Sequence, residues 1–212
     1  MLKYLFTFLS WLLLSAIILG HFVMPFEQFI IKSNWVYFVI GLALSYLLVY
    51  RRKHKLTFYM TFEHELTHNI WAVLTFNKPT GFHVNEDGSG LFQFEIGSNH
   101  SRIFITLAPY FFPTSCMIWL IFYEFFKIEY HLVYFLLMGL FFGYQFFRIQ
   151  ADFGPHQTDI QKFGMTLSLL FIIPLYIIFF GLIIVLTFNG WAGIYHHFVQ
   201  SIIASIELLK SN

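Results

Sequence analysis

Three residues between positions 64 and 68 have the types and the spacing of a hydrolytic metal site. His64, Glu65 and His68 form a His-Glu-x-x-His sequence inside an otherwise apolar run. Residues four apart on an α-helix lie on one face, so both imidazoles point the same way and can hold one Zn²⁺. The glutamate lies beside the ion without binding it, where it can take a proton from zinc-bound water. A chance match is expected on the order of 0.02 times in a chain of this size.

The apolar surroundings of this sequence favour a metal site. Burying ionisable groups in a membrane span is costly, so histidine and glutamate found there mark functional sites. The alternative is a polar cluster that other helices satisfy, or one that lines a water cavity without binding a metal.

A zinc ion that activates water needs a third protein ligand and one open position. The chain has three aspartates, of which Asp87 belongs to a turn signal and is expected to be structural. Asp152 and Asp159 flank a polar break between two apolar runs, and irregular backbone at membrane depth is tolerated where it lines a polar cavity. We expect Asp159 to be the third ligand, with Asp152 and then His156 as the alternatives.

The composition indicates a membrane-integral protein. Of 212 residues, 58% are hydrophobic, 22% are aromatic and only 11% are charged, whereas soluble domains have about 25% charged residues. A soluble domain could not cover the apolar surface that the mean hydropathy of +0.69 implies. The net charge of +1 provides no basic field for nucleic acid. The single cysteine, Cys116, excludes an intrachain disulfide framework and a cysteine-rich zinc site.

The apolar runs predict how the chain crosses the membrane. A spanning helix needs about 20 apolar residues, and we expect an all-α polytopic protein with about six transmembrane helices. The runs are residues 2–24, 35–50, 56–76, 103–126, 131–147 and 166–188. Gly139 and Gly143 permit close helix packing, although their spacing could arise by chance. Residues 191–212 form either an interfacial helix or a short final span.

The densest basic cluster, residues 51–55, indicates the orientation. Positive charge beside a span marks the cytoplasmic side, so we expect a cytoplasmic loop there, a cytoplasmic N-terminus and a multi-pass protein of the cell inner (plasma) membrane. The chain then has three parts. Residues 1–55 are two transmembrane helices and the basic loop, 56–165 are a core with the His-Glu-x-x-His helix, and 166–212 are a transmembrane helix with an amphipathic tail.

A simple count of these spans raises a topological difficulty. If each run crosses the membrane once, Asp159 emerges on the far side, away from His64. For the two residues to meet, residues 150–162 must fold back into the bundle, or one of the expected spans is wrong.

The polar segment after the third run predicts a short β-hairpin. Residues 86–90 contain two glycines and form a turn signal. Residues 91–96 alternate with period two, which places Phe92, Phe94 and Ile96 on one face.

In the His-Glu-x-x-His sequence, the hairpin and the later aspartate, the chain resembles the site-2 protease family of zinc intramembrane metalloproteases. The resemblance is strongest to the small branch that includes the sporulation-factor-processing proteases. The resemblance rests on residues 64–68 in a span, on a hairpin similar to the family's membrane-associated sheet, and on an aspartate after two further spans. It covers roughly residues 56–165, about half the chain. The family's Asn-Pro…Leu-Asp-Gly signature is absent, and residues 157–160 stand in its place.

The resemblance implies a zinc-dependent intramembrane endopeptidase. His64, His68 and Asp159 would hold Zn²⁺, and Glu65 would be the general base. The substrate would be a transmembrane segment of another protein in the lipid bilayer.

Peptide hydrolysis requires that the substrate helix unwinds, because a helix hides its carbonyl groups in backbone hydrogen bonds. The unwound stretch would pair with the strand edge at Phe92, Phe94 and Ile96 by strand addition. The alternative is a non-proteolytic membrane scaffold, or a metal-binding or transport protein, that retains the protease-like fold.

Overall fold

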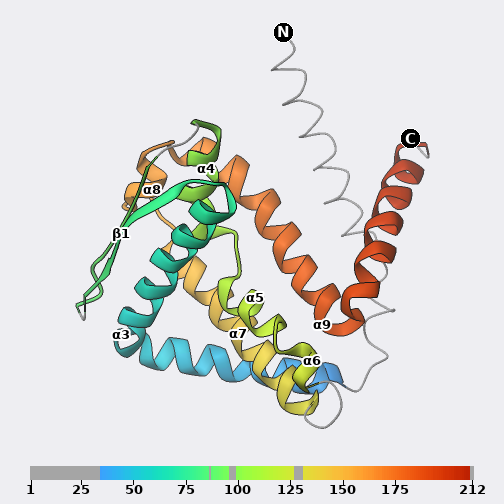
Figure 1. Cartoon of the computed structure of the whole chain (residues 1–212). Coiled ribbons are helices and arrows are strands. Elements are labelled where there is room, and N and C mark those ends of the chain that lie inside the picture. The colour runs from blue at the N-terminus through green and yellow to red at the C-terminus, as the bar shows by residue number, and fades with distance from the viewer. Residues whose placement is uncertain (1–33, 86, 96–98, 127–130, 211–212) are drawn as a thin grey trace. The chain divides into compact units, whose positions relative to one another are not determined.

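The computed structural model of the chain describes residues 34–85, 87–95, 99–126 and 131–210 (Figure 1). The expected first span, residues 2–24, lies outside them. The elements are α3 (Asn34–Leu74), β1 (Lys78–Val84), β2 (Gly90–Glu95), α4 (Asn99–Leu107), η1 (Ala108–Tyr110), α5 (Thr114–Leu120), α6 (Tyr123–Phe126), α7 (His131–Asp152), α8 (Thr158–Gln161) and α9 (Met165–Lys210). The chain divides into two compact units, and residues 34–172, which contain all the candidate site residues described below, belong to one of them.

The expected loop at residues 51–55 is wrong, because α3 continues through the basic cluster as helix. Arginine and lysine are good helix formers, and neither glycine nor proline interrupts this stretch. Figure 1 shows α3 changing direction between its blue-to-cyan first part and its teal second part. The two predicted helices, 35–50 and 56–76, are therefore two arms of one 41-residue helix.

The expected span at residues 103–126 is also wrong in its geometry. The chain forms α4, the short turn η1 and α5, and the first and last of these meet at an angle of 88°. Pro109 lies in η1, and Pro113 immediately precedes α5. Because proline cannot donate a backbone hydrogen bond and clashes with the preceding turn, a straight helix cannot run through this segment.

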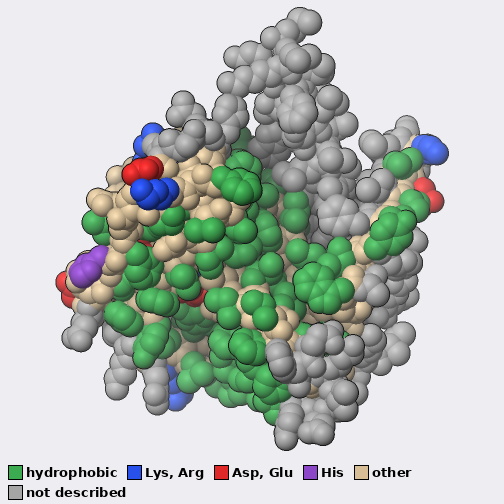
Figure 2. All heavy atoms as spheres, viewed as in Figure 1, with side chains coloured by type: hydrophobic (Ala, Val, Ile, Leu, Met, Phe, Trp, Pro, Cys, Tyr) green, Lys and Arg blue, Asp and Glu red, His purple; other side chains and the backbone are tan. Residues whose placement is uncertain are grey.

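The number of membrane-crossing helices among the described residues is lower than the six expected. Two helices are long and apolar enough to cross a membrane, Leu132–Asp152 and Met165–Trp191, and the bent pair Ser101–Tyr110 and Thr114–Leu120 would be a third if it counts as one span. The first arm of α3 is apolar but shorter. Figure 2 shows hydrophobic side chains spread widely over the face in view. An apolar outer surface of this kind is suited to contact with lipid.

Helices α3 and α7 pack closely through glycines, as the Gly139 and Gly143 spacing predicted. A Cβ atom at Gly139 would collide with the backbone carbonyl of Phe38, and one at Gly143 would collide with the side chain of Ser45. Gly41 of α3 meets the backbone of α7 at Leu136 in the same way. Small residues on both helices thus allow the backbones to approach each other.

The predicted hairpin is present as a two-stranded antiparallel sheet, with Phe82 opposite Phe92. Its turn packs on the second arm of α3, where the Thr61 hydroxyl donates a 2.8 Å hydrogen bond to the carbonyl oxygen of Gly88. Gly88 has a φ of +85°, which favours glycine. The described chain is thus mostly helical with one small two-stranded sheet, as predicted.

Helix α9 covers the expected span at 166–188 and continues through the tail. Its backbone departs from helical geometry at Gly190, where φ is +67° and ψ is −169°. The tail beyond Gly190 is thus a helical segment with its own direction.

Candidate metal site

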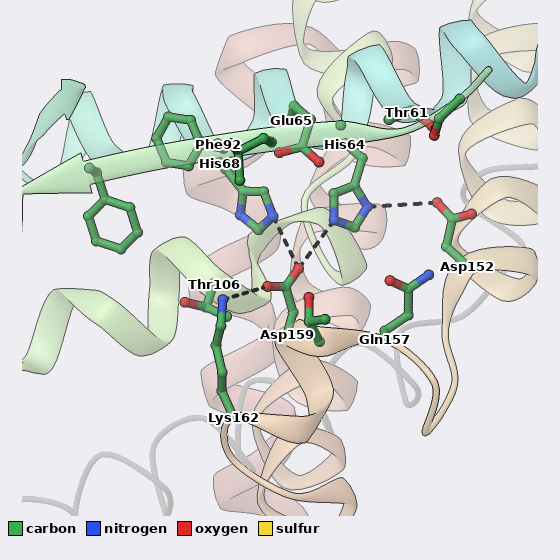
Figure 3. Close-up of a pocket in the computed structure, with 15 residues that line it drawn as sticks. Thr61, His64, Glu65, His68, Phe92, Thr106, Asp152, Gln157, Asp159 and Lys162 are labelled. Carbon is green, nitrogen blue, oxygen red and sulfur yellow. Dashed lines mark hydrogen bonds and ion pairs between the residues drawn. The ribbon is translucent and has the colours of Figure 1, made fainter. Parts of the chain in front are cut away.

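The structure brings His64, His68 and Asp159 together (Figure 3). The two histidines project from the same face of α3, with ring centroids 4.9 Å apart. Their Nε2 atoms lie 3.3 and 3.2 Å from Oδ2 of Asp159, which comes from the first turn of α8. One ligand atom from each residue lies within 4.8 Å of the others, so the group could hold a metal ion.

The structure brings Asp159 to His64, so the simple count of spans does not describe the path of the chain. That count took residues 103–126 as one straight helix, whereas the stretches Ser101–Tyr110 and Thr114–Leu120 meet at an angle of 88°. Helix α7 packs along α3, and the polar turn after it leads into α8, which begins at Thr158. Asp159 is thereby placed beside the histidines although 91 residues separate it from His68.

The hydrogen bond at the far side of the His68 ring directs the Nε2 atom toward the candidate metal position. Nδ1 of His68 lies 2.7 Å from the backbone carbonyl oxygen of Ile105, and since a carbonyl can only accept, Nδ1 carries a proton. In a neutral ring, Nε2 then offers a lone pair toward the carboxylate oxygen of Asp159 at 3.2 Å. Two acceptors facing each other require a proton or a metal ion between them, so this pair of atoms could hold either.

The other two members of the group also have an outer partner. Nδ1 of His64 faces Oδ2 of Asp152 at 3.8 Å, and Oδ1 of Asp159 lies 3.2 Å from Nζ of Lys162. Outer contacts of this kind orient metal ligands and fix the ring tautomers. Each of the three residues thus directs one possible ligand atom toward the shared centre, and the second nitrogen or oxygen of its side chain contacts an outer partner.

Asp159 is charged in this arrangement. Burial by itself would raise the pKa of its carboxyl group, but the contacts of Asp159 with the His64 and His68 rings outweigh burial. The net pKa of Asp159 therefore lies well below its usual value. An ionised carboxylate is the form that binds a metal ion.

Glu65 lies next to the group without belonging to it. Its side chain lines the same pocket, and Figure 3 shows it beneath β2, between the two histidines. Oε1 of Glu65 is so close to Gly90 that a Cβ atom there would lie 2.7 Å away. A carboxylate beside a metal position, but not among the ligands, has the arrangement of a general base.

A pocket of about 300 Å³ contains the site. Phe92 of β2 stacks on the His68 ring with centroids 5.7 Å apart, and Phe94 stacks on Phe92 at 5.6 Å. Both thus line the pocket, on the strand face that the alternating pattern predicted. Ile96, the third residue expected there, lies outside the described residues. A second hollow of about 390 Å³ shares Phe92, Phe94 and Lys162 with the pocket and extends to Arg102.

The remaining candidates are not members of this group of three. Oδ2 of Asp152 is bound by Arg148 and faces Nδ1 of His64 rather than the centre of the group. His156 is exposed, with its ring against Gly154. Asp87 has the expected structural role, because it accepts hydrogen bonds from the backbone and hydroxyl of Ser89. These bonds hold the pKa of Asp87 below its usual value.

Two charged residues near the site were missed by the sequence reasoning, namely Lys162 beside Asp159 and Arg148 beside Asp152. Arg148 could have been singled out from the sequence, because it is a charged residue directly after an apolar run. Lys162 follows Asp159 by three residues, a helical spacing that brings the two side chains together.

Comparison with known proteins yields no relative. A scan against family models found no match, and searches of curated proteins and of solved structures found none either. The chemistry of the site therefore has to follow from its own residues.

Proposed function

We propose that this protein is a zinc-dependent endopeptidase of the membrane, which hydrolyses a peptide bond in or near a transmembrane segment of another protein. The observation that carries the proposal is the meeting of His64, His68 and Asp159 with Glu65 beside them. Two imidazoles and one carboxylate, with room for a further ligand, form the donor set of hydrolytic zinc sites. This is also the site expected from the resemblance to site-2 proteases.

The residues divide the chemistry between them. When bound, zinc supplies a Lewis acid that favours ionisation of water and polarises the scissile carbonyl group. Glu65 accepts a proton from the attacking water and delivers it to the leaving nitrogen as the C–N bond breaks. His64, His68 and Asp159 hold the centre in place, and Phe92 closes one side of the pocket through its contact with His68.

The hairpin supports the proposal that the substrate binds as an extended segment. Strand β2 pairs only with β1 among the described residues, and its apolar side chains Phe92 and Phe94 line the pocket. A peptide lying along β2 can gain backbone hydrogen bonds there while its side chains enter the pocket. Peptide bonds become accessible to the site only in such an unwound stretch.

The membrane context is part of the same proposal. The two apolar helices and the broken helix pair support a protein embedded in a bilayer, and we place it as a multi-pass protein in the inner (plasma) membrane with its N-terminus in the cytoplasm.

A second function is compatible with the ligand set. Two histidines and one carboxylate with open positions also bind Fe(II) in oxygenases, and a metal-binding or transport protein could use the same group. The position of Glu65 favours hydrolysis, because neither alternative requires a carboxylate beside the metal that does not bind it.

The proposal is tested with the full chain reconstituted in liposomes with zinc. The substrate is a mixture of synthetic transmembrane peptides, and products are identified by mass spectrometry. We expect cleavage that is lost in Glu65→Gln and in the presence of a zinc chelator. Cleavage that is equal in wild type and Glu65→Gln, or no cleavage of any peptide by the zinc-loaded protein, contradicts the proposal.

A further inference from the structure

A buried arginine is linked to the metal group through Asp152. The side chain of Arg148 on α7 is 0% exposed. Its Nη1 lies 3.1 Å from Oδ2 of Asp152, its Nε lies 3.3 Å from Oε2 of Glu63, and its Nη2 donates to the carbonyl oxygen of Pro109 at 2.9 Å. A buried guanidinium is costly unless its charge and its donors are satisfied. Two carboxylates balance the charge, and Nη1 and Nη2 are hydrogen-bonded, while Nε contacts Glu63 as an ion pair without a hydrogen bond.

The first carboxylate, Glu63, is anchored on its other side. Its Oε1 accepts hydrogen bonds from the backbone nitrogen of Ser115, at 2.9 Å, and from the Ser115 hydroxyl. Glu63 precedes His64 on α3, so the contact ties the metal-binding helix to α5. The ion pair between Arg148 and Glu63 also connects α7 to α3. Three elements are thus joined at the residue that precedes His64.

The second carboxylate, Asp152, reaches the metal group. Its Oδ2 is shared between Arg148 and Nδ1 of His64, which lies 3.8 Å away. The opposite nitrogen of this ring, Nε2, faces Asp159. His64 is therefore flanked by two aspartates, one on each ring nitrogen, and only Asp159 also contacts His68.

We propose that Asp152 is a positioning residue for His64 rather than a metal ligand, and that Arg148, anchored by Glu63, holds Asp152 in place. A carboxylate at Nδ1 keeps the proton there, leaves Nε2 free for the metal and fixes the plane of the ring. Arginine suits this role because its planar fork contacts both carboxylates at once.

The two histidines are held in different ways, which makes the inference testable. His68 is oriented by the backbone carbonyl of Ile105, which no substitution removes. His64 is oriented by a side chain, so its support can be deleted. The inference rests on the metal site of the proposed function, but not on peptide hydrolysis.

The experiment measures zinc affinity of the full chain in detergent by competition with a chelator of known affinity. The variants are Asp152→Asn, Arg148→Gln, Arg148→Lys and Asp159→Asn, with Glu95→Gln as a control for removal of an exposed, ion-paired carboxylate. We expect Asp152→Asn and Arg148→Gln to weaken zinc binding by about 10- to 100-fold. We expect Arg148→Lys to restore part of the loss and Glu95→Gln to have no effect.

A spectroscopic measurement separates a positioning residue from a ligand. With Co²⁺ in place of zinc at saturating concentration, Asp152→Asn should keep the wild-type visible absorption bands, and Asp159→Asn should lose them. If Arg148→Gln does not fold, the zinc affinity and the cobalt spectrum of the near-isosteric Asp152→Asn variant are sufficient to test the inference.

Three results overturn the inference. Asp152→Asn binding zinc within twofold of wild type shows that Asp152 has no part in the site. Loss of the cobalt bands in Asp152→Asn, as in Asp159→Asn, shows that Asp152 is a ligand. A wild-type protein that binds no zinc removes the proposed function as well, which distinguishes that failure from the first two.

Discussion

Gly90 at the start of β2 lies directly against Glu65 of α3. A Cβ atom at residue 90 would lie 2.7 Å from Oε1 and 2.8 Å from Cγ of Glu65, and 2.6 Å from Cγ2 of Thr61. The absence of a side chain at Gly90 thus allows the hairpin to pack on the helix at the proposed general base. This contact joins the hairpin to α3 at the candidate site.

Substitution of Gly90 by valine should displace Glu65 without affecting the metal ligands. We expect cleavage to fall by about 100-fold, since small misplacements of a reacting group have effects of this size, while zinc affinity is unchanged. Gly81→Ala is the matched control, because a Cβ atom there meets only the flexible side chain of Gln93. Equal cleavage rates for Gly90→Val and Gly81→Ala would show that this contact has no role in catalysis.

Removal of the metal should destabilise the wild-type protein but not a variant that cannot bind it. A ligand that binds only the folded state raises its stability by about 4 kcal/mol at a thousandfold excess over Kd. We expect EDTA to lower Tm of the wild type and of His83→Ala, whose substituted histidine is exposed in the hairpin. EDTA should leave Tm of His68→Ala unchanged, and a drop in that variant equal to the wild-type drop would place the metal elsewhere.

Lys162 should matter less for zinc binding than Asp152. Lys162 contacts Asp159 but is 46% exposed, so water screens the pair, whereas Arg148 holds Asp152 from a fully buried position. We expect Lys162→Gln to weaken zinc binding by only a fewfold, measured by the same chelator competition. A larger effect for Lys162→Gln than for Asp152→Asn would reverse this order.

The packing of α3 on α7 should depend on Gly139. A side chain there would collide with the backbone of Phe38, which cannot rotate away, so we expect Gly139→Val to lower the free energy of unfolding by about 1–3 kcal/mol or more. Ala43→Val is the control, since residue 43 is exposed on α3. Unfolding is measured in mixed micelles, and equal stability of the two variants would contradict close packing at Gly139.

The sequence predicted the local features of the site well. The spacing of His64 and His68 places both rings on one helix face whatever the rest of the fold does, and alternation alone places Phe92 and Phe94 on one side of a strand. Asp159 was favoured as the partner of the histidines because the chain has so few carboxylates near a break in its apolar runs. The structure brings it to them, and its role as a ligand stays a prediction.

Features that depend on the path of the chain were predicted less well. Hydropathy could not tell that α3 continues through residues 51–55, because basic residues fit a helix as well as a loop. Pro109 and Pro113 could have indicated a break in the helix. The residues around them are apolar, however, so hydropathy alone predicted one continuous span. The ion pair between Arg148 and Glu63 joins residues 85 positions apart, so no local pattern reveals it.

The central claim is that His64, His68 and Asp159 together hold one zinc ion. It is tested most directly by measuring zinc per chain, after equilibration with a weak chelator, in wild type, His64→Ala, His68→Ala, Asp159→Asn and Glu65→Gln. We predict one zinc per chain in the wild type and in Glu65→Gln, and none in the other three. Zinc retained by all three ligand variants, or absent from the wild type, would contradict the claim.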